Sequence, residues 1–130
     1  MIIRTLGGLA AGLLVAILTI IAIEAVGNQL YPPPAGYDMT SASAESLPFA
    51  TLIWPLIGWF LGAIAGGWVA LRVAGERWTG WAIAACVLAA TILNLVLIRH
   101  PTWMIVAGVI APLLGGWIAQ LLPKTRRRAA

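Results

Sequence analysis

Residues 6–23, LGGLAAGLLVAILTIIAI, form an apolar run that contains no charged side chain. A helix needs about 20 such residues to cross the hydrocarbon core of a bilayer. Three further apolar runs follow, and the whole chain of 130 residues is 62% hydrophobic and only 9% charged. This composition is too apolar for a soluble domain. The sequence therefore predicts an all-α membrane protein, built as a bundle of four transmembrane helices.

We expect the four spans near residues 5–27, 48–71, 78–98 and 102–122, within one transmembrane domain that covers residues 1–130. An outer loop, 28–47, joins the first two spans, and a basic tail, 123–130, follows the fourth. Strands are disfavoured because the apolar runs are continuous instead of alternating. The first run is longer than the apolar part of a signal peptide, so we interpret it as a span.

The basic residues predict how the bundle is oriented. With four spans, Arg4, Arg72, Arg77 and the tail residues Lys124 and Arg126–Arg128 lie on one side, and only Arg99 lies on the other. The positive-inside rule then places both termini in the cytoplasm of a bacterial inner membrane. This distribution also accounts for the net charge of +4, so we expect no nucleic-acid partner.

Small residues about one turn apart predict where the helices pack. Lipid tails are as apolar as leucine, so helices associate where small side chains allow a close approach. In the third span we assign this face to Ala82, Cys86 and Ala89, with Cys86, the only cysteine, as a packing residue. The predicted packing glycines are Gly8 and Gly12 in the first span, Gly58, Gly62 and Gly66 in the second, and Gly108 and Gly115 in the fourth.

Two prolines, Pro55 and Pro112, interrupt the second and fourth spans and predict kinks, because proline removes a helical hydrogen bond. Their similar contexts suggest two parallel helix-hairpin repeats, although proline and glycine are common in membrane helices. Both interpretations stay open. The tryptophans fall near span ends and are interpreted as interface anchors: Trp54, Trp59 and Trp103 on the outer side, and Trp68, Trp78, Trp81 and Trp117 on the inner side.

Five polar residues fall in the outer third of the predicted bundle: Glu24, Asn28, Asn94, Arg99 and His100. Ionisable residues inside a membrane are expensive and often functional. Glu24 could carry a proton or bind a cation, with His100 as a second titrating group. Alternatively, Glu24 pairs with Arg99 and the cluster closes the end of the bundle. A helical projection places Glu24 roughly opposite Gly8 and Gly12.

Little in the sequence predicts enzymatic chemistry. No phosphate loop, nucleophile elbow or zinc-protease motif is present, and no His, Cys, Asp or Glu residues are spaced as metal ligands. His100 is the only histidine, so a haem would need Met104 as its second ligand. We therefore predict a non-enzymatic protein with no cofactor other than bound lipid.

Two resemblances extend these observations. The stretch EAVGNQLYPPPAG, residues 24–36, together with the turn RHPTW, residues 99–103, resembles an uncharacterised family of short bacterial four-helix integral membrane proteins. In addition, IAIEAVGNQL, residues 21–30, is similar to the first helix of small multidrug resistance exporters. That resemblance implies a dimer that exchanges protons for cationic drugs at Glu24. Here, however, the glutamate lies near the outer end of its span, and the loop with three prolines departs from that family.

Three functions follow as expectations. The first is an accessory or structural subunit that acts through helix–helix association, either in a larger membrane complex or as a homo-oligomer. Its partners would be membrane lipids and other transmembrane helices. The alternatives are a small proton-coupled transporter that uses Glu24 and a cofactor-binding subunit around His100.

Overall fold

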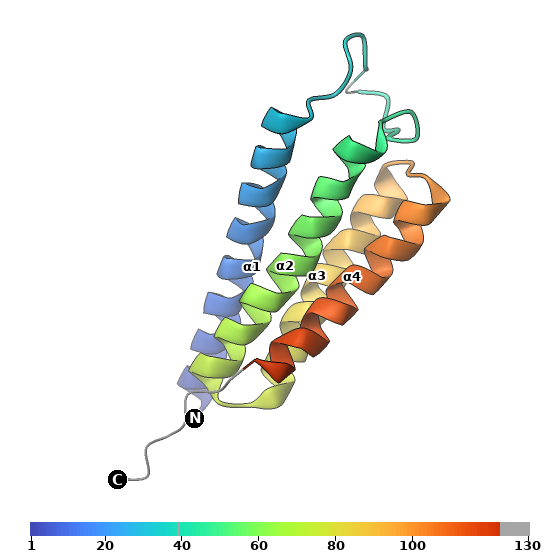
Figure 1. The fold of residues 1–130 in the computed structure, drawn as a ribbon. Helices are drawn as coiled ribbons and strands as arrows, with labels where there is room; N and C mark the ends of the chain where they lie inside the picture. Colours follow the sequence, from blue (N-terminus) through green and yellow to red (C-terminus); the bar gives the residue numbers. More distant parts are fainter. Residues whose placement is uncertain (39, 123–130) are drawn as a thin grey trace.

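The computed structural model describes residues 1–38 and 40–122, and over these residues it contains four α-helices and no strand (Figure 1). The helices are α1 (Ile2–Leu30), α2 (Phe49–Ala74), α3 (Arg77–Leu97) and α4 (Thr102–Leu121). All four are long and apolar enough to cross a membrane. The predicted class, an all-α membrane protein with four transmembrane helices, is confirmed. The predicted basic tail, with Lys124 and Arg126–Arg128, lies outside the described residues.

The helix ends lie within three residues of the predicted ends. The clearest difference is at α1, which continues through Gly27 and Asn28 to Leu30 before the chain enters the loop. The backbone N–H of Tyr31 donates to the Gly27 carbonyl at 2.8 Å. The prolines at 32–34 cannot extend the helix, because each lacks an N–H donor. Asn28 is therefore a helical residue and does not belong to the loop.

Helix α2 is the centre of the bundle and contacts the other three helices. Helix α3 also contacts α1 and α4, whereas these two described helices do not contact each other. In Figure 1, α1 and α4 accordingly lie on opposite sides of α2. The start of α1 and the end of α4 lie at the same end of the bundle as the α2–α3 turn (Figure 1). We call the opposite end, with residues 31–48 and 98–101, the loop end.

Helices α1 and α2 approach so closely that their backbones nearly touch. A Cβ atom built on Gly12 would lie 2.6 Å from the Gly66 carbonyl oxygen, and one built on Gly66 would lie 2.5 Å from the Gly12 carbonyl oxygen. Any larger residue would therefore push the helices apart. The contact follows residues four apart on each helix: Gly8, Gly12, Ala16 and Ile20 on α1, against Gly58, Gly62, Gly66, Ala70 and Ala74 on α2.

The remaining glycines of the predicted set pack α4 into the bundle. Gly115 lies against the backbone of α2, where an added Cβ would be 2.6 Å from the Phe60 carbonyl oxygen. Gly108 is also buried and faces the ring of Trp59. Pro55 and Pro112 both lie inside their helices, α2 and α4. The kinks at these prolines and the hairpin repeat remain predictions.

The small face predicted for the third span is wrong. Cys86 and Ala89 are exposed and Ala82 is half-buried. The buried residues of α3 are Thr79, Gly80, Ile83, Ala84, Val87 and Thr91. Alanine and cysteine are small enough to face lipid at little cost, so smallness alone does not identify an interface. The larger Ile83 and Val87 determine the packing face because they fill the space between the helices.

At the end opposite the loop end, Glu76 ties the start of α1 to the α2–α3 turn. The Thr5 hydroxyl donates to Glu76 Oε1 at 2.7 Å, and the Trp78 indole N–H donates to Glu76 Oε2 at 2.5 Å. The hydrogen bond from Thr5, followed by that from Trp78, lowers the pKa of the Glu76 carboxyl from its ordinary value of 4.5. Gly75, at φ 78°, adopts the left-handed conformation that ends α2.

Candidate functional site

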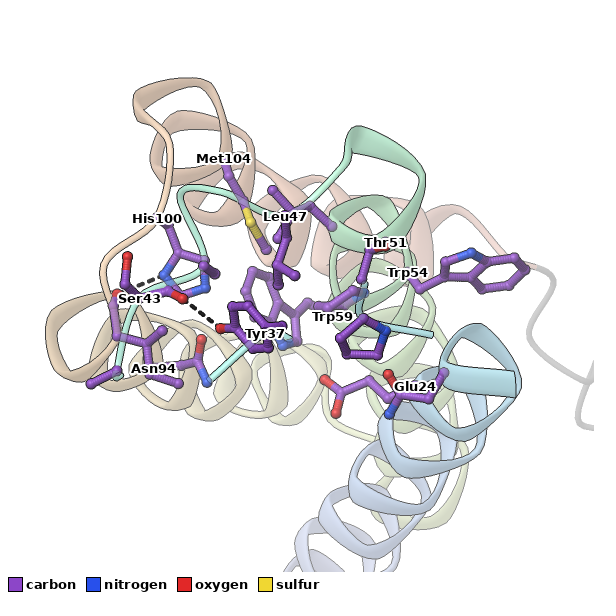
Figure 2. A pocket seen from close by; sticks show the side chains of 17 residues that line it. Glu24, Tyr37, Ser43, Leu47, Thr51, Trp54, Trp59, Asn94, His100 and Met104 are labelled. Carbon is purple, nitrogen blue, oxygen red and sulfur yellow. Dashed lines mark hydrogen bonds between the residues drawn. The ribbon is translucent and has the colours of Figure 1, made fainter. Parts of the chain in front are cut away.

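The loop end encloses a cavity of about 260 Å³, which we call the loop-end cavity. Residues from all four helices line it, and the loop between α1 and α2 contributes further walls (Figure 2). Its polar lining residues are Glu24, Asn28, Tyr37, Ser43, Thr51, Trp54, Trp59, Asn94 and His100. Four of the five predicted polar residues, Glu24, Asn28, Asn94 and His100, therefore line a single cavity.

Glu24 reaches the cavity because it continues the row of residues that packs α1 against α2. Each step of four residues turns about 40° around a helix, so a row of such steps drifts away from the face on which it started. From Gly8, four steps lead to Glu24 and a fifth leads to Asn28. Four such steps add up to about 160°, so Glu24 does lie roughly opposite Gly8 around α1, as the helical projection predicts. The contact with α2 follows this row around α1 from Gly8 to Ile20. Glu24, one step further, therefore lies half-buried at the cavity.

His100 lies on the other side of the cavity from Glu24, near Asn94 (Figure 2). The ring is buried, with 8% of its surface exposed. Its Nδ1 lies 2.7 Å from the Ile98 carbonyl oxygen. A carbonyl oxygen can only accept a hydrogen bond, so Nδ1 carries the proton. In the tautomer with a single proton, Nε2 then presents a lone pair, and no described residue donates to it.

The loop is held over the cavity by two sets of hydrogen bonds. The Tyr37 hydroxyl donates to the Ser43 carbonyl oxygen at 2.5 Å, within the loop itself. The Ala44 N–H donates to the Arg99 carbonyl at 2.6 Å, and the Arg99 N–H donates to the Ala42 carbonyl at 2.9 Å. The loop is thereby paired with the turn between α3 and α4. Sequence spacing gave no sign of this pairing.

Arg99 does not belong to the cavity. Its side chain is exposed and is not among the lining groups. Among the described residues, the Glu24 carboxyl accepts no hydrogen bond and forms no salt bridge with Arg99. The alternative in which Glu24 pairs with Arg99 therefore receives no support from the geometry, and the role of Arg99 here is carried by its backbone.

Two aromatic rings, those of Tyr37 and Trp59, lie between Glu24 and His100 (Figure 2). Trp59 is buried, with 6% of its surface exposed, so its interpretation as an interface anchor is wrong. Trp54 packs over Gly27 and lies 6.3 Å from the Tyr31 ring, between ring centroids. Its indole N–H is buried without a hydrogen-bond partner in the described part of the chain.

The walls of the cavity are rich in hydrogen-bond acceptors. Glu24 offers carboxylate oxygens, His100 offers Nε2, and Tyr37 offers only lone pairs because its proton is committed to Ser43. The amides of Asn28 and Asn94 and the hydroxyl of Thr51 can either donate or accept, so they adapt to a ligand. No lysine or arginine is among the lining residues.

The site offers little to a metal or a haem. Across residues 1–38 and 40–122, no three His, Cys, Asp or Glu side chains group closely enough to hold a metal ion. Met104, the second ligand that a haem would need, lines the cavity together with His100. A volume of about 260 Å³ lies below the usual range for drug-sized ligands and is too small for a macrocycle.

No family model, curated protein or solved structure matches the chain. Its function is therefore inferred from the geometry and chemistry of the cavity.

Proposed function

We propose that this multi-pass membrane protein binds a small organic cation in the loop-end cavity, with Glu24 as the counter-ion. The observation that carries the proposal is the half-buried carboxyl of Glu24, which lines the cavity and has no hydrogen-bond partner among the described residues. A carboxylate at membrane depth needs a proton, a cation or hydrogen-bond donors to offset its loss of water. The cavity leaves room for such a partner beside it.

The charge of the lining favours a cation over an anion. Glu24 is the only acidic residue among the described lining groups, and none of them is a lysine or an arginine. The rings of Tyr37 and Trp59 add faces that attract cations. An anion would meet a carboxylate and committed acceptors, whereas an ammonium group would find acceptors for each of its N–H bonds.

The positive-inside rule adds a direction to this proposal. Arg4, Arg72 and Arg77 lie at the end of the bundle opposite the cavity, so the loop end would face outward from the cytoplasm. The ligand would enter from the periplasmic side of a bacterial inner membrane. Between the cavity and the other end, α1 and α2 pack backbone to backbone at Gly12 and Gly66. Transport coupled to a proton on Glu24 would therefore require these helices to separate.

Ligand binding by the purified protein in lipid nanodiscs tests the proposal. We expect small primary and secondary amines to raise the unfolding temperature, because a ligand that binds only the folded state stabilises it. Glu24→Gln, which keeps the shape but removes the charge, should abolish this shift. Glu45→Gln is the matched control, since Glu45 is exposed in the loop. Equal shifts in the parent protein and the Glu24→Gln variant would contradict the proposal.

An accessory or structural role remains the second candidate. The glycines that motivated it, such as Gly12 and Gly66, are used within the bundle. What still favours association is that the small residues Cys86 and Ala89 of α3 are exposed, where they would let another helix approach closely. Native mass spectrometry of the protein released from membranes tests this role. A partner or a homo-oligomer would support it, and a protein that is strictly monomeric and binds only lipid would exclude it.

The expectation of a cofactor around His100 is tested by the absorbance spectrum of the purified protein. A Soret band, the main absorption band of haem, would support a haem cofactor at His100.

A further inference from the structure

We infer that the ligand of the loop-end cavity has two polar ends, an ammonium group that binds Glu24 and a neutral O–H or N–H donor that binds Nε2 of His100. This inference rests on the proposed function and names the chemical class of its ligand, an amino alcohol with an apolar body. His100 then becomes the residue that determines specificity.

The hydrogen bond between His100 and the Ile98 carbonyl has a defined direction. The Ile98 carbonyl lies 2.7 Å from Nδ1 and fixes the proton there. With the proton on Nδ1, Nε2 of the neutral ring is an acceptor, and the residue, with 8% of its surface exposed, lines the cavity. No hydrogen bond from a described residue reaches Nε2. A ligand with a donor at this end would supply that hydrogen bond.

The other polar groups beside His100 are those of Tyr37 and Asn94, and neither donates to Nε2. The ring of Tyr37 lies between His100 and Glu24 in Figure 2, and its hydroxyl donates a hydrogen bond to the Ser43 carbonyl oxygen. It cannot donate to Nε2 without breaking that bond. Asn94 is the remaining polar neighbour in this part of the cavity, and the structure shows no hydrogen bond between its amide and His100. The geometry therefore leaves the donor position open to a ligand.

The charge of the ligand must balance the charge of the cavity lining. When ionised, Glu24 supplies one negative charge to the lining, and no described lining residue is a lysine or an arginine. One ammonium group balances this charge. A second cation at the His100 end would remain uncompensated inside the membrane, where an unpaired charge is expensive. The second donor is accordingly a neutral hydroxyl or amide.

The body of the ligand follows from the walls between the two ends. Leu47, Leu52 and the rings of Tyr37 and Trp59 are among the apolar walls of the cavity. They suit an aromatic or alkyl segment. The volume of about 260 Å³ accepts a compact molecule with one ring and excludes extended drugs.

Three commercial compounds of similar size test the inference. Tyramine carries both ends, phenethylamine lacks the hydroxyl group, and 4-ethylphenol lacks the ammonium group. We expect tyramine to bind the parent protein in nanodiscs about tenfold more tightly than phenethylamine, because one hydrogen bond to a buried acceptor is worth that much. 4-Ethylphenol should bind more weakly than either amine. Isothermal titration calorimetry supplies the dissociation constants.

Two variants at one position separate specificity from structure. His100→Phe keeps a buried ring but removes the acceptor, so tyramine and phenethylamine should bind it equally. His100→Gln retains an acceptor near the position of Nε2 and should recover part of the preference. Glu24→Gln should weaken both amines. If His100→Phe fails to fold, the tyramine preference of the parent protein and of His100→Gln decides the matter.

The outcomes distinguish the two proposals. Equal binding of both amines to the parent protein, together with loss of both in Glu24→Gln, would overturn the two-ended ligand and leave the cation site standing. A preference for tyramine that survives in His100→Phe would also overturn it. If neither amine binds in a manner that depends on Glu24, the proposed function fails, and this inference fails with it.

Discussion

The middle of the α1–α2 interface and the loop end are built from the same two rows of residues, yet one is closed and the other is hollow. In the middle, residues such as Gly12 and Gly66 let the two backbones touch. About three to four turns further along α1, the same row presents Glu24 and Asn28, and the space beside them is a cavity. Closely packed small residues fix the two helices in place, and larger polar residues on the same row then face a space that the bundle does not fill.

Helix α1 therefore uses one row of side chains both to pack against α2 and to line the cavity. Contacts with α2 on both sides of Glu24, at Ile20 and at Gly27, hold this part of α1 in place. The Glu24 carboxyl therefore needs no partner of its own to keep its position in the bundle. Such a division leaves a carboxyl group free for a ligand while keeping the bundle rigid.

The largest expected effect comes from breaking the closed region. Gly66→Val should destabilise the protein by about 3 kcal/mol, because overpacking of a tight interface typically costs 1–3 kcal/mol and the nearest atom here is backbone. Unfolding by steric trapping in bicelles measures the change in free energy. Gly7→Val is the control, since no atom lies within 4 Å of a Cβ at that position. Equal losses in both variants would mean that helix propensity, and not helix contact, determines stability.

A smaller effect is expected at the loop end. Tyr37→Phe removes the hydrogen bond to the Ser43 carbonyl and should cost about 1 kcal/mol. Hydrogen exchange should accelerate in the loop while the middle of α1 and α2 stays protected, because the lost hydrogen bond joins two residues of the loop. Faster exchange throughout the bundle would instead show that the loop and the helices unfold as one unit.

The smallest effect is expected at the opposite end and depends on pH. The pKa of Glu76 is lowered on folding, first by the Thr5 hydroxyl and then by the Trp78 indole. The stabilisation is therefore complete above the ordinary pKa of 4.5 and is lost as the pH falls through the lowered value. Thermal unfolding between pH 6 and about pH 3 should show a decline that Glu76→Gln reduces. The same decline in both proteins would assign it to other carboxyl groups.

Hydropathy and spacing were sufficient to predict four spans and most of the packing glycines. The signal is strong there because a bilayer demands long apolar helices and because backbone contact tolerates only the smallest residue. The same reasoning failed for α3, where Cys86 is exposed and Ile83 is buried. Small residues are tolerated on both lipid-facing and helix-facing surfaces, so their position does not identify the buried side.

The candidate site was only partly predictable. Polar residues at membrane depth are rare, and this rarity predicts four of the lining residues from the sequence: Glu24, Asn28, Asn94 and His100. The contribution of Tyr37 could not be predicted, since it depends on how a loop of irregular structure folds back on the bundle. The prediction that Trp59 is an interface anchor is wrong because the residue is buried. Tryptophan near a span end usually marks the interface, and the loop that covers Trp59 has no regular sequence pattern.

The connectivity of the cavity sets an order of assembly during synthesis. The α1–α2 hairpin contains every glycine of its own interface and can close as soon as residue 74 has entered the membrane. The wall that carries Asn94, His100 and Met104 emerges from the ribosome last. Any nascent chain that stops before α4 therefore holds Glu24 on a finished hairpin without an enclosed cavity. The cavity is therefore complete only after residues from all four helices have been made.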